Sequence, residues 1–103
     1  MSLIIDVIIP AFNEQNSVQK VIEDIPKNVV RDIIVVNNNS NDATAENARN
    51  AGATVVDEKF QGYGAACLKG MDLVAYKIIK PEIIVFLYAD YSDHPEELTF
   101  LIF

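Results

Sequence analysis

The chain has 103 residues, half of them hydrophobic, and a formal net charge of −7. This length and composition predict one domain with a compact core and argue against intrinsic disorder. Because no cluster of lysine or arginine interrupts the acidic balance, the composition excludes a protein that binds along a nucleic-acid backbone.

The first predicted elements are a strand and a helix. Residues 3–9 are almost entirely apolar and predict a strand, which we expect Pro10 to end because proline cannot donate to the sheet. An apolar stripe at helical spacing follows, and Pro26 closes it. Its members are Val18, Val21, Ile22 and Ile25. Asn16 and Gln19 resemble a loose capping box at the start of this helix.

The middle of the chain predicts a strand, a short helix and another strand. Residues 32–36 form the strand, which leads into the polar run of residues 37–42. Residues 43–51 are rich in alanine and predict a helix with Gly52 at its C-cap. Residues 53–56 predict the next strand.

The last third predicts a long helix and a buried strand. The helix spans residues 64–80, with a buried face that includes Leu68, Met71, Ala75 and Ile78, and Pro81 ends it. The strand begins at Ile83, where the sequence reads Ile-Ile-Val-Phe-Leu before turning polar. Such an unbroken apolar run is typical of a parallel strand that is covered on both faces. His94-Pro95 opens a further predicted helix, with Asp93 and Glu96 spaced as its cap.

The alternation of strands and helices predicts an α/β protein with a Rossmann-like parallel sheet of about four strands and helices on both faces. The loops after parallel strands share one edge of the sheet, where ligands bind in open α/β folds. The polar and glycine residues expected at this edge are Asn13, Glu14, Asn37, Asn38, Ser40, Asp42, Gly62, Gly64, Asp90 and Asp93.

Each of these residues has a structural and a chemical interpretation. Gly62 and Gly64 either begin a helix or let its backbone amides approach a diphosphate. Asp90 and Asp93 either support a turn and cap a helix or hold a divalent cation. Asn38 either forms a turn or reads the edge of a base.

Several motifs in this order resemble the family 2 glycosyltransferases, and most closely their polyprenyl-phosphate mannosyl- and glucosyltransferase branch. They read Pro-Ala-Phe-Asn-Glu from Pro10, Val-Val-Asn-Asn-Asn-Ser-Asn-Asp-Ala-Thr from Val35, Gly-Tyr-Gly-Ala-Ala from Gly62, and Tyr-Ala-Asp-Tyr-Ser-Asp-His-Pro from Tyr88. The resemblance covers nearly the whole chain and implies the amino-terminal, donor-binding half of a GT-A domain over residues 1–103.

The resemblance also implies a set of roles. The first motif would hold the nucleoside, Asn38 would contact the base, and Asp90 would coordinate Mg²⁺ or Mn²⁺ at the donor diphosphate, with Asp93 as a second metal ligand. The implied nucleotide-sugar-binding residues are Pro10, Ala11, Phe12, Glu14, Asn38, Ser40, Gly62, Gly64, Ala89 and Asp90. The chain departs from the family at two positions, where Asn38 and Tyr88 replace aspartates.

The resemblance leads us to expect an enzyme of cell-wall or lipid-linked glycan biosynthesis. It would transfer sugar from a nucleotide-diphosphate sugar to a polyprenyl phosphate or a saccharide. The alternatives are a non-enzymatic nucleotide-binding module and, less favoured because residues 10–14 are not rich in glycine and arginine, a nucleotidyltransferase.

The composition and the end of the chain lead to expectations about cellular location and assembly. A lone cysteine, Cys67, and the lack of a signal-like start fit a cytoplasmic protein, with the full-length protein at the cytoplasmic membrane face. The apolar run at residues 100–103 suggests truncation at the C-terminus. We therefore expect the catalytic base to lie beyond Phe103 and no transfer by residues 1–103 alone. We also expect a homodimer, formed through the terminal helix or through the open edge of the sheet.

Overall fold

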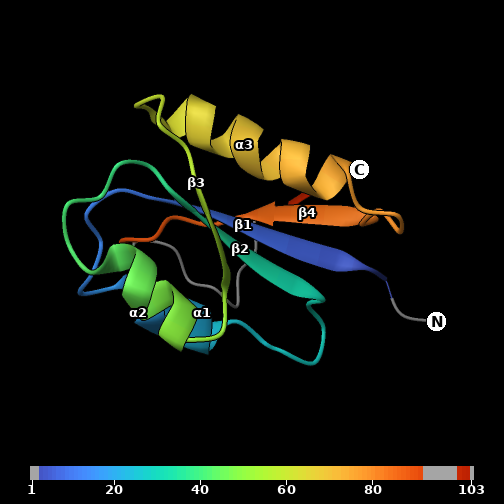
Figure 1. The fold of residues 1–103 in the computed structure, drawn as a ribbon. Helices are drawn as coiled ribbons and strands as arrows, with labels where there is room; N and C mark the ends of the chain where they lie inside the picture. The colour runs from blue at the N-terminus through green and yellow to red at the C-terminus, as the bar shows by residue number, and fades with distance from the viewer. Residues whose placement is uncertain (1–2, 92–99, 103) are drawn as a thin grey trace.

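A computed structural model describes residues 3–91 and 100–102 and has the predicted α/β architecture. The elements in chain order are β1 (Ile5–Ala11), α1 (Val18–Asp24), β2 (Asp32–Asn37), α2 (Thr44–Asn50), β3 (Thr54–Asp57), α3 (Tyr63–Ala75), β4 (Ile83–Phe86) and β5 (Phe100–Ile102). The sheet order is β3-β2-β1-β4-β5, and the first four strands run parallel, as predicted. Figure 1 shows the sheet between α3 on one face and α1 and α2 on the other.

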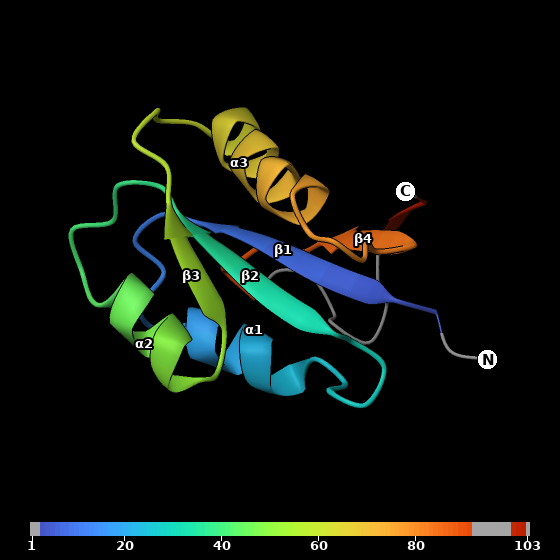
Figure 2. The ribbon, with the colours of Figure 1, turned by 45° about the vertical axis from the view of Figure 1, so that its right-hand side comes forward.

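The two faces of the sheet bury two separate apolar clusters. Val7 and Ile9 of β1 pack on the α1 side, whereas Ile8 packs on the α3 side with Ala66 and Val74. This alternation follows from the two-residue period of a strand. Figure 2 shows the sheet with α3 on one side and α1 and α2 on the other. Each strand in the centre is therefore covered on both sides, which explains its continuous apolar sequence.

The fifth strand was not predicted. Residues 100–102 pair antiparallel with β4, with Val85 opposite Phe100 and Ile83 opposite Ile102. The prediction of a terminal helix through this segment was wrong there, because a short apolar run has no periodicity that separates helix from strand. The predicted start of that helix, at His94 and Pro95, lies outside the described residues.

Pro10 does not end the first strand, contrary to prediction. β1 continues to Ala11, and Pro10 pairs in register with Val36. The Ala11 carbonyl accepts a hydrogen bond from the Asn38 amide on the β2 side. Because backbone groups of successive strand residues point to opposite sides, the backbone nitrogen of Pro10 points toward β4. The ladder with β4 ends at the pair of Ile8 and Phe86. Proline is tolerated here because it lies beyond the last ladder pair with β4, at the end of a strand.

The helix α3 ends at Ala75, five residues before the predicted Lys80. With about 1.5 Å of rise per residue it is roughly 20 Å long, close to the length of β1, so a longer helix would overshoot the sheet it covers. Its buried residues are Ala66, Gly70 and Val74. Three residues that were predicted to be buried, Leu68, Ala75 and Ile78, are exposed. The face of α3 that packs on the sheet is therefore narrower than predicted, and its residues are smaller.

The predicted helix caps were partly right. Gly52 adopts the positive φ of 98° expected after α2. The capping box of Asn16 and Gln19 was wrong, because α1 begins at Val18 and Ser17 occupies the N-cap position. The hydroxyl of Ser17 contacts Ala89 and Glu14 instead of capping its own helix.

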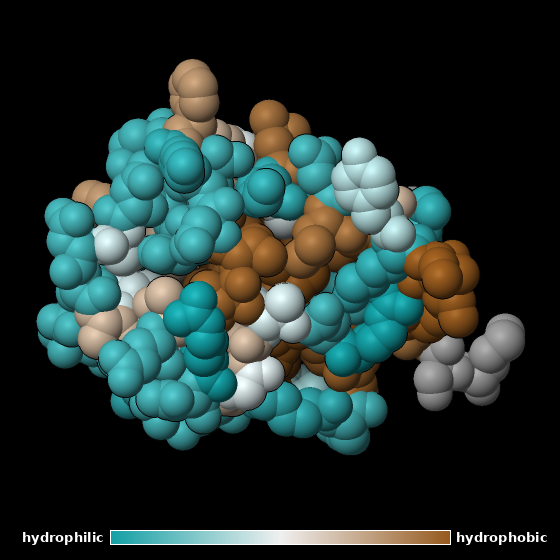
Figure 3. Space-filling model, in the orientation of Figure 1, coloured by the Kyte–Doolittle hydropathy of each residue, from teal (hydrophilic) through white to brown (hydrophobic). Residues whose placement is uncertain are grey.

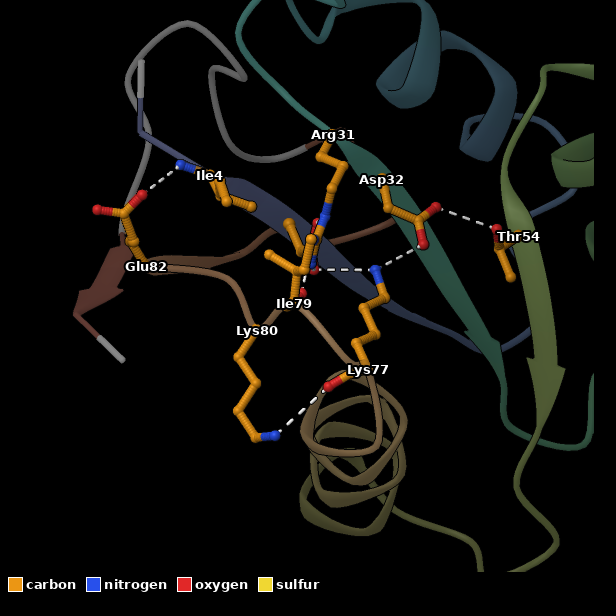
Figure 4. Close-up of polar contacts among 9 residues, drawn as sticks. Ile4, Arg31, Asp32, Thr54, Lys77, Ile79, Lys80 and Glu82 are labelled. Atoms are coloured by element: carbon orange, nitrogen blue, oxygen red, sulfur yellow. Dashed lines mark hydrogen bonds and ion pairs between the residues drawn. The ribbon is translucent and has the colours of Figure 1, made fainter. Parts of the chain in front are cut away.

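A charged cluster joins the amino ends of the strands to the segment after α3. Asp6 is fully buried and accepts from Arg31 at 3.0 and 2.7 Å and from Lys77 at 2.9 Å. Lys77 also reaches Asp32 at 2.9 Å, as Figure 4 shows. Burial opposes ionisation of Asp6, but the hydrogen bonds from Arg31 and Lys77 outweigh it and hold its pKa below the usual value.

The surface is mostly polar on the face of Figure 3, with a hydrophobic area over the strands between α3 and α2. β3 is the sheet edge on that side and its residues are only partly buried or exposed. Over the described part of the chain, none of the helices has the length and apolar character needed to cross a membrane.

Candidate functional site

A pocket of about 310 Å³ lies at the carboxyl ends of β1 and β4, against the first turn of α3. The predicted binding residues that line it are Pro10, Ala11, Phe12, Glu14, Asn38, Gly62, Ala89 and Asp90. Ser40 and Gly64 were also predicted but do not line it. The parallel topology thus brings residues from the first, second, third and fourth motifs to one cavity.

Ser40 joins two loops to each other. Its hydroxyl accepts the Asn13 amide at 2.9 Å, and the Asn41 amide donates to the Asn13 side chain at 2.8 Å. Thr44 Oγ1 accepts the Glu14 amide at 2.8 Å in the same region. These bonds hold the loop after β1, which carries Phe12 and Glu14, against the loop after β2.

Asp42 supports the same junction from the start of α2. Its carboxylate accepts the Thr44 amide at 3.0 Å and the Gln15 amide at 3.4 Å. The N-cap position of α2 is Ala43, so Asp42 stands one residue before the cap. The hydrogen bond from the Thr44 hydroxyl lowers the pKa of Asp42.

Asn38 is buried and fully engaged with the segment between β3 and α3. Its side-chain nitrogen donates to the carbonyls of Glu58 at 2.9 Å and Phe60 at 2.7 Å. Its oxygen accepts the Gly62 amide at 2.8 Å. The side chain therefore has little hydrogen-bonding capacity left for a ligand.

Gly62 occupies the N-cap position of α3 with a φ of 134°, a backbone conformation that other residues rarely adopt. The predicted role of this glycine in the helix entry is consistent with that conformation. Gly62, Tyr63 and Ala66 at the amino end of α3 line the pocket, so the partial positive charge of this helix end lies next to it.

Glu14 and Ala89 are brought together by Ser17. The Ser17 hydroxyl lies 2.6 Å from the Ala89 carbonyl and 3.1 Å from the Glu14 carboxylate, so its single proton serves one of them at a time. Asp90 follows at the exposed end of this loop and lines the pocket. The start of α1 thus holds the loop that carries Asp90.

Two tyrosines form a wall of the pocket that was not predicted. The rings of Tyr63 and Tyr88 stack with centroids 5.5 Å apart and planes inclined by 30°. Gln61 and Ala66 are the other lining residues that sequence reasoning missed. Tyr63 lies between the two predicted glycines, and Tyr88 is one of the two positions at which the chain departs from the family. Their positions within the motifs could therefore have marked both tyrosines as pocket residues.

Two ionisable groups beside this wall, Tyr63 and Cys67, stay neutral. Partial burial raises the pKa of Tyr63, and neighbouring Cys67 and Tyr88 raise it further. Burial also raises the pKa of the Cys67 thiol. Tyr63 therefore offers a neutral hydroxyl, and Cys67 is not an activated nucleophile.

The described residues supply few metal ligands. Asp90 and Glu14 are the carboxylates that line the pocket, and residues 3–91 contain no group of three or more candidate ligands. Mg²⁺ commonly binds through one or two carboxylates together with substrate phosphates, so this donor set fits a cation held jointly with a diphosphate. The predicted second ligand, Asp93, lies outside the described residues.

The parallel α/β sheet carries its pocket at the carboxyl ends of the strands, which is where ligands bind in open α/β folds. The family described as Glycosyl transferase family 2 matches residues 6–102. The chain belongs to this family, and it has the GT-A fold of the solved relatives.

Relatives with known names are longer than this chain. RfbJ of Shigella flexneri is 48% identical over 61 residues, which cover 58% of this chain and 47% of RfbJ. The 4,4'-diaponeurosporenoate glycosyltransferase of Staphylococcus aureus is 40% identical over 72 residues, which cover 63% of this chain and 19% of that protein. The chain therefore spans less than half the length of these relatives.

One similar solved structure contains bound ligands. Glucosyl-3-phosphoglycerate synthase of Mycobacterium tuberculosis, solved with Mn²⁺, uridine diphosphate and glucosyl-3-phosphoglycerate, matches with a TM-score of 0.76 and 28% identity. The match covers 90% of this chain and 36% of that enzyme.

Proposed function

We propose that the pocket binds the nucleoside diphosphate of a nucleotide sugar and that the protein transfers the sugar to an acceptor. The observation that carries this proposal is the meeting of Phe12, Glu14, Gly62 and Asp90 in one cavity. The solved relative that binds uridine diphosphate and Mn²⁺ supports the same ligand class.

The pocket offers complementary groups for each part of such a ligand. Exposed Phe12 supplies an apolar surface for the nucleoside. The amino end of α3 favours the negative diphosphate through its amides and partial positive charge. Asp90 would hold Mg²⁺ or Mn²⁺, with Asp93 proposed as a second ligand, and a cation bound there would neutralise the charge that develops on the leaving diphosphate.

The proposed reaction is a displacement at the anomeric carbon of the sugar. The acceptor oxygen forms a bond to that carbon, the bond to the diphosphate oxygen breaks, and the nucleoside diphosphate leaves with the electron pair. A phosphate acceptor would attack as its anion, whereas a saccharide hydroxyl would lose its proton to a general base that the described residues do not assign. We propose a polyprenyl phosphate or a saccharide as the acceptor. A lipid acceptor would require the whole protein to work at the cytoplasmic face of a membrane.

A non-enzymatic nucleotide-binding module is the second candidate. The observation that favours it is Tyr88, which stands in the pocket where the family resemblance implies a carboxylate. Product analysis with a nucleotide sugar and the whole protein distinguishes the candidates, because only a transferase consumes the donor.

Calorimetric titration with uridine and guanosine diphosphates, each with Mn²⁺, tests the binding step. We expect Asp90→Ala to weaken binding at least about tenfold, since it removes a charged ligand of the cation. Asp72→Ala is the matched control, because Asp72 is an exposed carboxylate on α3 that does not line the pocket. Equal affinity of wild type and Asp90→Ala would contradict the metal role, and no binding by the wild type would contradict the proposal.

A further inference from the structure

The orientation of the Asn38 amide is determined by its surroundings. Two backbone carbonyls, of Glu58 and Phe60, face its nitrogen, and the Gly62 N–H faces its oxygen. Exchanging nitrogen and oxygen would replace all three hydrogen bonds with repulsive contacts. Only 4% of Asn38 is exposed, so water cannot replace these bonds.

These bonds make the pocket wall depend on Asn38. The segment that it holds leads directly into Gln61, Gly62 and Tyr63, which line the pocket. Asn39 adds a further hydrogen bond to this segment, from its side-chain nitrogen to the Lys59 carbonyl at 2.8 Å. The end of β2 therefore determines where the first turn of α3 begins.

We propose that Asn38 is a positioning residue that holds segment 58–62 in its ligand-binding conformation and does not read the base. This inference rests on the proposed function, and it differs from the base contact that the family resemblance implied. Its basis is that every strong hydrogen-bonding position of the side chain is already occupied by the protein.

A carboxylate at this position could not hold segment 58–62 in the same way. It has no N–H to donate, so one oxygen would face the carbonyls of Glu58 and Phe60. The other oxygen could still accept the Gly62 N–H, but the repulsion from the two carbonyls would leave the buried charge poorly compensated. Asn38→Asp, which restores the residue type common in the family, should therefore weaken ligand binding. A base contact predicts a different result, because a carboxylate accepts a base N–H more strongly than an amide does.

Calorimetry with Mn²⁺ and three probes, uridine diphosphate, guanosine diphosphate and inorganic diphosphate, tests the inference. We expect Asn38→Asp to weaken all three by a similar factor of about ten or more, because each depends on the same pocket wall. Lowering the pH from about 8 to about 5 should partly restore binding, since a protonated carboxyl can donate one hydrogen bond. Asn41→Asp makes the same chemical change at an exposed position and should have no effect.

Two further measurements keep the inference testable. Hydrogen exchange at the Gly62 amide should accelerate in Asn38→Asp, with or without a ligand. Asn39→Gly removes the hydrogen bond to Lys59 at an exposed residue whose φ of 66° glycine accepts, so it should fold and weaken all probes by a smaller common factor.

The outcomes separate the two proposals. Tighter binding by Asn38→Asp, or a change in the preference between the two nucleotides with inorganic diphosphate unaffected, would overturn the inference and assign Asn38 to the base. If the wild type binds no probe, the proposed function fails. Unchanged exchange at Gly62 in Asn38→Asp would overturn the positioning role independently.

Discussion

Gly70→Ala should destabilise the protein, although alanine normally stabilises a helix. Gly70 lies in the middle of α3 and is buried against β1. A Cβ atom at this position would lie 2.5 Å from Ile8 Cγ2 and 3.1 Å from Ile8 Cδ1. Ile8 is fully buried in the central part of the sheet and is stiff at its branched Cβ, so it cannot turn away without disturbing its neighbours.

The magnitude follows from two opposing terms. Replacing glycine with alanine inside a helix contributes about 0.8–1.0 kcal/mol of stability. Inserting a methyl group into a close-packed core costs about 1–3 kcal/mol. We expect a net loss of about 0–2 kcal/mol in the free energy of unfolding, or up to about 15 °C in Tm for a domain of this size.

Gly64→Ala is the matched control within the same helix. A Cβ at Gly64 would meet no heavy atom within 4 Å, so we expect a gain of about 0.5–1 kcal/mol. Because both variants make the same chemical change, the difference between them, about 1–3 kcal/mol, isolates the contact with Ile8. Urea unfolding of both variants at 25 °C measures it. Gly70→Ala as stable as Gly64→Ala would refute the reasoning.

Three further predictions concern charge, metal and assembly. Asp6→Asn should cost about 2–3 kcal/mol, less than for a fully buried pair because Arg31 and Lys77 are partly exposed. Because the pKa of Asp6 is lowered in the folded state, its contribution is fully present above about pH 4 and is lost as the pH falls through the folded value. The stability difference between wild type and Asp6→Asn should therefore be full at neutral pH and shrink on acid titration below about pH 4. Tyr88→Asp adds a carboxylate beside Asp90 in the pocket and should tighten Mn²⁺ binding several-fold in calorimetry, whereas exposed Tyr76→Asp should not; equal affinities would contradict this. The homodimer stays a prediction: β5 is an edge strand with one neighbour among the described strands, and sedimentation at micromolar concentration that shows only monomer would exclude pairing through it.

The sequence by itself determined the parallel sheet and the edge that carries the pocket. Apolar runs such as residues 33–36 are long enough for strands and too uniform for a half-exposed sheet, so they specify strands covered on both faces. Helices between them require crossover connections of one hand. This topology brings Phe12 and Asp90 to the same edge, although they are distant in the chain.

Only the tertiary structure decided what several individual side chains do. Asn38 holds carbonyls that lie 20 or more residues further along the chain, and Asp6 meets Lys77 at a separation of 71 residues. The continuation of β1 through Pro10 depends on where β4 stops, and the face that α3 buries depends on the room left by Ile8. Periodicity describes one element at a time, whereas hydrogen-bond partners and packing space are contributed by elements remote in sequence.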